Sequence, residues 1–187
     1  MEKQDVIAEI KSSGDDKDFI GNVIELLKYN GHYIAFPWSF DGRIMWYRKD
    51  LFDAAGIQAP PESFDEFRAD AGKLTKDGNY GFAFAGADSG AFQTMLSFMI
   101  NNGGGFFNTE GKPDLMNVRN VETLKLFSDM VKVDKSINPA CVGYNADDMS
   151  KIFGSGKCAM MISNPGIIDK NHVFPGLETD IEIKPYE

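Results

Sequence analysis

Four side chains with binding chemistry lie close together between residues 38 and 43. Trp38 and Phe40 carry aromatic faces, and Asp41 and Arg43 carry planar charged groups that form hydrogen bonds in pairs. Aromatic faces pack against the apolar side of a sugar ring, while carboxylate and guanidinium groups bind its hydroxyls. The cluster therefore predicts a site for a sugar or another small polar solute. The alternative is that both rings pack around a hinge and that Arg43 only pairs with Asp41.

A short glycine-rich segment, Gly154-Ser-Gly-Lys157, resembles part of a phosphate-binding loop. That motif requires glycine where this chain has Lys151, and serine or threonine where it has Cys158. The glycines also follow a predicted helix and precede a predicted strand, the reverse of the order that places a pyrophosphate at a helix N-terminus. The segment therefore predicts a turn that ends a helix, not a nucleotide site.

Candidate catalytic groups are few. The carboxylate pairs Asp15-Asp16 and Asp147-Asp148 could supply the acid and base of glycoside hydrolysis, but adjacent helical residues point in different directions. The second pair follows Asn145, where acidic side chains favour the positive end of a helix dipole. His32 and His172 have no second ligand at metal-binding spacing. We expect no catalytic residues, no metal site and no cofactor.

The composition of the chain argues against two classes of binding partner. The chain has 187 residues, a net charge of −9 and an isoelectric point near 4.7, so it would repel nucleic acid and anionic lipid. Its two cysteines, Cys141 and Cys158, have no neighbours at metal spacing and are predicted to be inert. Residues 1–13 are too polar for a signal peptide, so we expect no export signal in this chain.

Hydrophobic periodicity predicts the elements that must position these groups. Helices are expected at 17–29, 49–55, 63–74, 89–101, 117–133 and 145–153, and strands at 33–36, 43–47, 80–85 and 157–163. Asn30-Gly31 is taken as the end of the first helix, and Ser63, Asn117 and Asn145 as N-caps. Helices that alternate with strands predict an α/β fold with a central sheet flanked by helices, in a single domain over 1–187.

The 117–133 helix has the clearest apolar stripe. We expect its apolar stripe, Val121, Leu124, Phe127 or Ser128, and Val131, to face the core. The charged residues Glu122, Lys125 and Lys132 should face water.

Several short sequence blocks, taken in their order along the chain, carry a family resemblance. They are Gly31-His-Tyr-Ile-Ala-Phe-Pro37, Ser39-Phe-Asp41, Met45-Trp-Tyr-Arg-Lys-Asp-Leu-Phe52, Pro60-Pro-Glu-Ser-Phe-Asp-Glu-Phe67, Asn102-Gly-Gly, Phe153-Gly-Ser-Gly-Lys-Cys-Ala-Met160 and Ile162-Ser-Asn-Pro165. Together, over about residues 31–166, they resemble the family 1 extracellular solute-binding proteins of ABC importers, the maltose-binding-protein-like family. No single block decides the resemblance, but the combined order and spacing do.

The resemblance implies a fold and a cellular setting. Family members have two α/β lobes of the type II periplasmic-binding-protein fold, which close on a solute, and the segment 31–48 would cross between the lobes. This chain would then be mostly the C-terminal lobe, without the N-terminal lobe. The partners implied are the solute and the ABC permease subunits, in the periplasm or at the cell surface.

The resemblance also implies ligand contacts at Asp41, Gln93 and Tyr144. Ser163 and Asn164 are further candidates, because loop ends converge at the strand termini where open α/β sheets bind ligands. The sequence departs from the family pattern at Gly166, where family members usually have a tryptophan that stacks on the sugar. Other polar solutes therefore remain alternatives to a sugar. We expect Trp38, Asp41, Arg43, Tyr144 and Asn164 to line one face. The leading hypothesis is capture of a mono- or oligosaccharide for import, without enzymatic activity. The alternatives are a truncated fragment that cannot bind, and a glycoside hydrolase.

Overall fold

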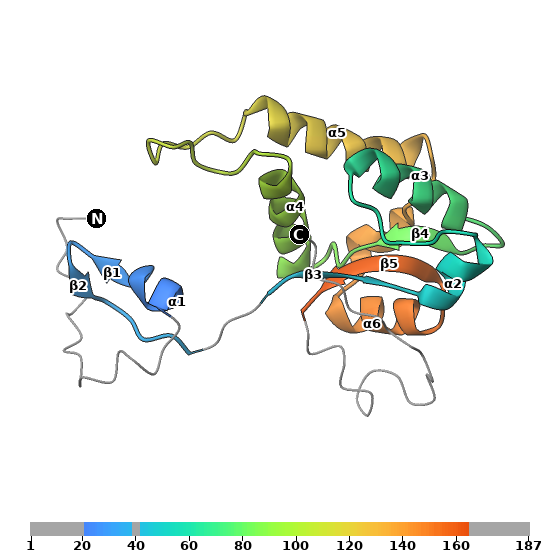
Figure 1. Ribbon diagram of the computed structural model, residues 1–187, viewed down its shortest axis with the longest axis horizontal. Coiled ribbons are helices and arrows are strands. Elements are labelled where there is room, and N and C mark those ends of the chain that lie inside the picture. Colours follow the sequence, from blue (N-terminus) through green and yellow to red (C-terminus); the bar gives the residue numbers. More distant parts are fainter. Residues whose placement is uncertain (1–20, 39–41, 165–187) are drawn as a thin grey trace. The chain divides into compact units, whose positions relative to one another are not determined.

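The computed structural model describes residues 21–38 and 42–164 (Figure 1). Contacts divide the chain after Asp41 into two compact units, Met1–Asp41 and Gly42–Glu187. The division falls inside the segment 31–48, for which a crossing between lobes is expected. The assignment of 1–187 to a single domain stays a prediction.

The first unit contains a short helix and a hairpin. Helix α1 spans Gly21–Glu25, and strands β1 (Lys28–Tyr29) and β2 (His32–Tyr33) pair antiparallel. Asn30 and Gly31 both have positive φ, 50° and 83°, which is the conformation that a two-residue hairpin turn requires. The predicted helix at 17–29 is therefore wrong at its C-terminal end, because Asn30-Gly31 joins two strands.

The second unit is built on a three-stranded mixed sheet with the order β3-β5-β4. Its strands are β3 (Ile44–Tyr47), β4 (Tyr80–Ala83) and β5 (Cys158–Ser163), as predicted to within two residues. The central strand β5 runs parallel to β4 and antiparallel to β3, with Ile44 opposite Ser163. The first four residues of β5 are all buried although they point alternately to the two faces, so both faces of the sheet are covered at this strand.

Five helices flank this sheet: α2 (Lys49–Ala54), α3 (Phe64–Leu74), α4 (Ser89–Asn101), α5 (Val118–Lys132) and α6 (Ala146–Gly154). A 3-10 turn, η2, spans Pro139–Gly143. The predicted N-caps are confirmed, since Ser63, Asn117 and Asn145 each accept a hydrogen bond from a first-turn amide. The α/β class with a flanked sheet is confirmed.

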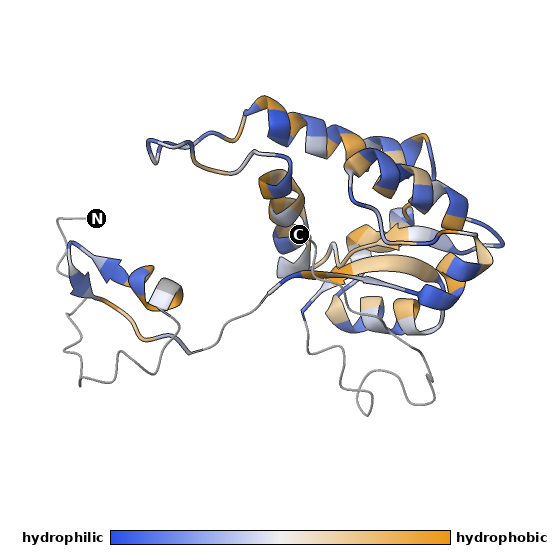
Figure 2. Ribbon diagram, in the orientation of Figure 1, coloured by the Kyte–Doolittle hydropathy of each residue, from blue (hydrophilic) through white to orange (hydrophobic). Residues whose placement is uncertain are grey.

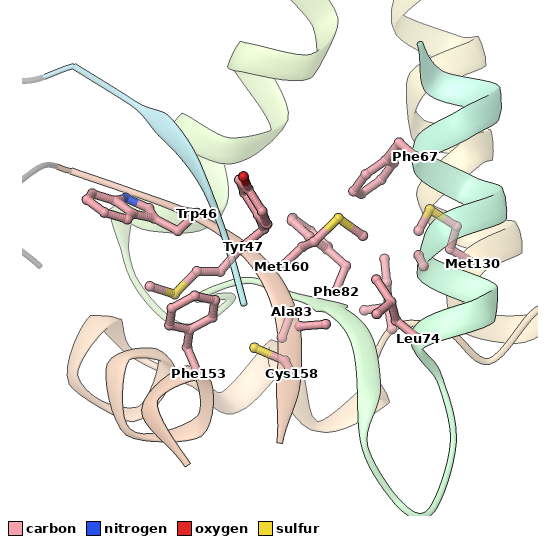
Figure 3. Close-up of a cluster of buried hydrophobic side chains, with 14 of the residues drawn as sticks. Trp46, Tyr47, Phe67, Leu74, Phe82, Ala83, Met130, Phe153, Cys158 and Met160 are labelled. Carbon is pink, nitrogen blue, oxygen red and sulfur yellow. The ribbon is translucent and has the colours of Figure 1, made fainter. Parts of the chain in front are cut away.

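The core occupies both faces of the sheet. In Figure 1, α3 and α5 lie on one side and α6 on the other, and Figure 2 shows β4 and β5 as mostly apolar. Successive strand residues alternate between the two faces. Met160 and Phe82 therefore point toward Phe67 of α3, while Phe153 of α6 lies near Trp46 on the opposite face (Figure 3). Phe98 and Phe127 extend this core, with ring centroids 4.9 Å apart.

The predicted orientation of α5 is wrong for two of its residues. Val121 and Leu124 are 46% and 49% exposed. The buried residues of α5 are Asn120, Thr123, Phe127 and Met130, whose spacing forms a stripe rotated away from the predicted one. The prediction failed because two members of the true stripe are polar. Val131 does pack against the core, and Glu122, Lys125 and Lys132 are exposed as expected.

Two further observations concern the cysteines and the lengths of the helices. Cys141 and Cys158 are both buried and both free. Among the residues that the structure describes, no helix is long and apolar enough to cross a membrane.

Candidate functional site

The C-terminal edge of the sheet is the natural place for a ligand in this fold. Parallel strands β4 and β5 end at this edge with Ala83 and Ser163, and the antiparallel strand β3 begins there with Ile44. In open α/β sheets, ligands bind outside the carboxyl ends of the strands, where the connecting loops converge. The residues just after β4 and β5 and just before β3 are therefore the candidates.

Three of the predicted site residues meet at this edge. Arg43 precedes β3, and its Nη2 donates a hydrogen bond to Oε1 of Gln93, in the second turn of α4. Ser163 lies opposite Ile44, and its carbonyl oxygen accepts a hydrogen bond of 3.3 Å from the indole Nε1 of Trp46. Asn164 follows Ser163 directly. Arg43, Gln93 and Ser163 thus come together from segments up to 120 residues apart, for which the sequence alone carried no contact signal.

Tyr144 is held at the same edge through the loop that follows β4. Its carbonyl oxygen accepts a hydrogen bond of 2.9 Å from the amide of Ala87. Asp88 strengthens this link, because its carboxylate caps α4 at Gly90 N and also accepts from the amide of Ala146 at 3.0 Å. The N-termini of α4 and α6 are therefore linked by hydrogen bonds to the Asp88 carboxylate. Tyr144 lies two residues before α6, next to this link.

The hydroxyl group of Tyr144 stays uncharged and forms hydrogen bonds. Its oxygen accepts a hydrogen bond of 2.9 Å from Nδ2 of Asn138. Burial raises the pKa of Tyr144 above its ordinary value, so the hydroxyl keeps its proton at neutral pH. It can therefore still donate a hydrogen bond to a solute oxygen.

The other predicted site residues belong to the first unit. Trp38 is 98% exposed. Phe40 and Asp41 lie outside the described residues, so the stacking role of Phe40, the ligand contact of Asp41 and its pairing with Arg43 stay predictions. The prediction that Trp38, Asp41, Arg43, Tyr144 and Asn164 line one face is likewise untested as a whole.

Sequence reasoning missed a pocket between α3, α4 and the sheet. It has a volume of about 60 Å³ and is lined by Arg43, Met45, Pro61, Phe64, Phe67, Ser97, Phe98, Asn101 and Ile162. Arg43 thus borders both this pocket and the C-terminal edge. The lining comes from four separate segments, so no local motif could have revealed it.

Sequence reasoning also missed an aromatic pair next to Gln93. Phe92 of α4 and Phe106 of the following loop have ring centroids 5.2 Å apart, and the Phe92 side chain is 55% exposed. A sequence signal was present, because Phe92 directly precedes a residue expected to contact the ligand.

The motifs set aside as structural have structural partners. The Asp148 carboxylate accepts a hydrogen bond of 3.2 Å from the amide of Asn145 and completes a capping box. Nη1 of Arg48 donates to the carbonyl oxygens of Phe153 and Gly154, both at 3.1 Å, where α6 ends. Within the described ranges, no group of three or more His, Cys, Asp or Glu side chains could hold a metal ion.

One known family accounts for nearly the whole chain. The bacterial extracellular solute-binding proteins match residues 3–185. The chain belongs to this family. A putative binding protein of Brucella abortus (strain 2308) is 32% identical to this solute-binding chain over 168 residues, which make up 87% of the chain and 41% of that relative. The chain thus spans about two fifths of the length of this curated relative.

Solved structures of solute-binding proteins have the same fold. A sugar transporter from Arthrobacter chlorophenolicus A6, crystallised with laminaribiose, has a TM-score of 0.81 and 32% identity, covering 91% of this chain and 43% of its own. An ABC transporter solute-binding protein from Agrobacterium radiobacter K84, in complex with ribitol, has a TM-score of 0.71 and 28% identity, covering 90% and 46%. The resemblance and the type II periplasmic-binding-protein fold predicted from the sequence are confirmed.

Proposed function

We propose that this chain forms part of the solute-capturing component of an ABC importer, and that its solute is a carbohydrate or a polyol. The observation that carries the proposal is the meeting of Arg43, Gln93 and Ser163 at the C-terminal edge of the sheet. Guanidinium and amide groups bind hydroxyl oxygens in a planar geometry, and the edge lies where ligands enter this class of sheet. Relatives crystallised with laminaribiose and with ribitol support a ligand rich in hydroxyls.

The setting and the partners form part of the proposal. The family is described as extracellular, which supports a place in the periplasm or at the cell surface. There the solute would be held between this lobe and an N-terminal lobe, and then passed to the permease subunits. Capture and release need no covalent step, so we propose that the chain is not an enzyme.

The expected affinity of this chain alone is low. If two lobes contribute equally to a complex with a dissociation constant near 1 μM, about −8 kcal/mol, one lobe retains about −4 kcal/mol. That value corresponds to a dissociation constant of about 1 mM, because one lobe still has to immobilise the solute.

The test is a titration of the isotope-labelled chain with glucose, maltose, laminaribiose, mannitol and ribitol, followed by NMR chemical shifts. We expect shifts at Arg43, Gln93 and Asn164. Gln93→Ala removes an amide hydrogen bond and should weaken binding about fivefold. Gln58→Ala is the matched control, because Gln58 is exposed and shares a pocket with Tyr47 and Lys49, at the opposite end of β3.

Three results would contradict the proposal. The absence of shifts with every solute would favour a fragment that cannot bind. Equal binding by the Gln93 and Gln58 variants would place the solute elsewhere. Hydrolysis of chromogenic glycosides by the purified chain would favour the glycoside hydrolase alternative.

A further inference from the structure

Two asparagines of this chain directly precede a glycine, in Asn30-Gly31 and in Asn102-Gly103. This order of residues favours deamidation, in which the backbone nitrogen of the glycine attacks Cγ of the asparagine side chain. Glycine permits the attack because it has no side chain to shield its nitrogen. The structure places the two pairs in opposite surroundings, so their reactivities should differ.

Deamidation proceeds in two steps that need only water. The glycine amide gives up its proton to hydroxide, its nitrogen forms a bond to Cγ, and the bond from Cγ to Nδ2 breaks. The released amide group takes a proton from water and leaves as ammonia. Water then opens the cyclic imide at either of its two carbonyl carbons, which yields aspartate or isoaspartate. The first step requires a glycine amide without a hydrogen-bond acceptor and an asparagine side chain that can turn onto it.

Asn30 and Gly31 meet both requirements. They are exposed and form the turn between β1 and β2. A Cβ added at Gly31 would have no atom within 4 Å, so nothing crowds the turn. Among the described residues, no hydrogen bond restrains the Gly31 amide or the Asn30 side chain. Only two residue pairs join β1 and β2, and such a short hairpin opens at little cost.

Asn102 and Gly103 are restrained at both reacting groups. The Gly103 amide, which would be the nucleophile, donates a hydrogen bond of 2.9 Å to the carbonyl oxygen of Ile100. Nδ2 of Asn102 donates to the carbonyl oxygen of Arg119 at 2.9 Å and to Oγ1 of Thr123 at 3.3 Å. These bonds fix the side chain on α5, so it can turn onto the Gly103 nitrogen only after they break.

We propose that Asn30 is a site of spontaneous deamidation in the folded chain, and that the fold protects Asn102 from the same reaction. Each net hydrogen bond that has to break lowers the population of the reactive form about fivefold. Because at least two bonds have to break at Asn102, its reaction should be slower than that of Asn30 by about tenfold or more.

The modification changes the turn in two ways. The new carboxylate adds a negative charge to a chain whose net charge is already −9. In isoaspartate the main chain runs through Cβ, which lengthens a turn that two residues with positive φ now close. The pairing of Tyr29 with His32 should therefore loosen, next to the start of the segment 31–48.

The test follows both asparagines in one sample by mass spectrometry of proteolytic peptides. The chain would be kept at mildly alkaline pH, once folded and once in urea. In the folded chain we expect Asn30 to acquire the mass of the acid about tenfold faster than Asn102, or faster still. In urea the bonds that restrain Asn102 are lost, so the two rates should converge. The rate at Asn30 should also rise with pH, because the nucleophile is the deprotonated amide.

Asn30→Gln is the matched variant, because it keeps a side-chain amide but would have to close a larger ring. It should abolish the fast reaction and leave the rate at Asn102 unchanged, which would assign the fast reaction to Asn30. Equal rates at the two asparagines of the folded chain would overturn the proposal. A rate at Asn30 that is about tenfold or more below its rate in urea would also overturn it, because the turn would then protect this residue.

Discussion

Removing the Asn120 side chain tests how the glycine segment before Phe106 is held. Asn120 is buried in α5 and contacts Gly105 through two short hydrogen bonds, with weaker contacts from Nδ2 to the carbonyl oxygens of Asp114 and Leu115 at 3.2 and 3.3 Å. Each hydrogen bond to Gly105 contributes about 1 kcal/mol, and each buried group left without a partner costs about 1 to 3 kcal/mol. Asn120→Ala should therefore lower the free energy of unfolding by about 2 to 4 kcal/mol.

The measurement is equilibrium urea unfolding followed by circular dichroism. Val121→Ala is the matched control, because Val121 is the next residue of α5 and is 46% exposed, so its loss should change stability by about 0.5 kcal/mol or less. Hydrogen exchange should also become faster at the backbone amide of Asp114. This amide donates a hydrogen bond to the carbonyl oxygen of Phe106 in the same segment. If the two variants unfold at the same urea concentration, Asn120 does not clamp the loop.

Two further predictions concern α5 and its neighbour α3. Phe127→Ala should destabilise the chain by about 3 to 5 kcal/mol, whereas Leu124→Ala, at a half-exposed position, should cost about 1 kcal/mol or less; equal costs in urea would refute the observed orientation of α5. The hydrogen bond from Arg68, at 2.6 Å, lowers the pKa of Asp134, so this ion pair stabilises the fold above the unfolded carboxyl pKa and is lost as the pH falls through the folded value. Asp134→Asn should thus cost about 1 kcal/mol or less at pH 7, and this cost should disappear as the pH falls through the folded pKa of Asp134; a cost that does not change with pH would contradict it.

Local rules predicted most of the elements in the second unit. Ser63, Asn117 and Asn145 mark where α3, α5 and α6 begin, because a short polar side chain that binds a first-turn amide is a signal written in a few adjacent residues. Strand β5 was equally readable, since a short apolar run after Gly156 favours a strand buried on both faces.

The failures arose where tertiary contacts outweigh local pattern. Asn30-Gly31 suits both the end of a helix and a hairpin turn, and the pairing of Lys28 with Tyr33 favours the hairpin. The buried face of α5 was predicted wrongly because Asn120, a polar residue, lies on it. Hydrogen bonds to Gly105 satisfy its buried amide, and a hydrophobicity pattern carries no signal of such bonds.

The ligand contacts of the candidate site residues stay predictions, and the sequence carries no signal of which of these residues touch one another. Gln93 is expected from the family resemblance, but its hydrogen-bond partner Arg43 precedes β3 and is 50 residues away in sequence. Phe106 was not named at all, because it contacts Phe92 only through the loop conformation that Asn120 imposes.

The two buried cysteines have a practical consequence for optical work on this protein. Burial raises the thiol pKa of both Cys141 and Cys158, so little thiolate forms at neutral pH, and neither sulfur is open to a bulky reagent. Maleimide dyes should therefore react only when the chain unfolds. A cysteine introduced on the hairpin after Phe106 could carry an environment-sensitive fluorophore in an otherwise native sequence, and its emission would then report solute arrival without interference from the native thiols.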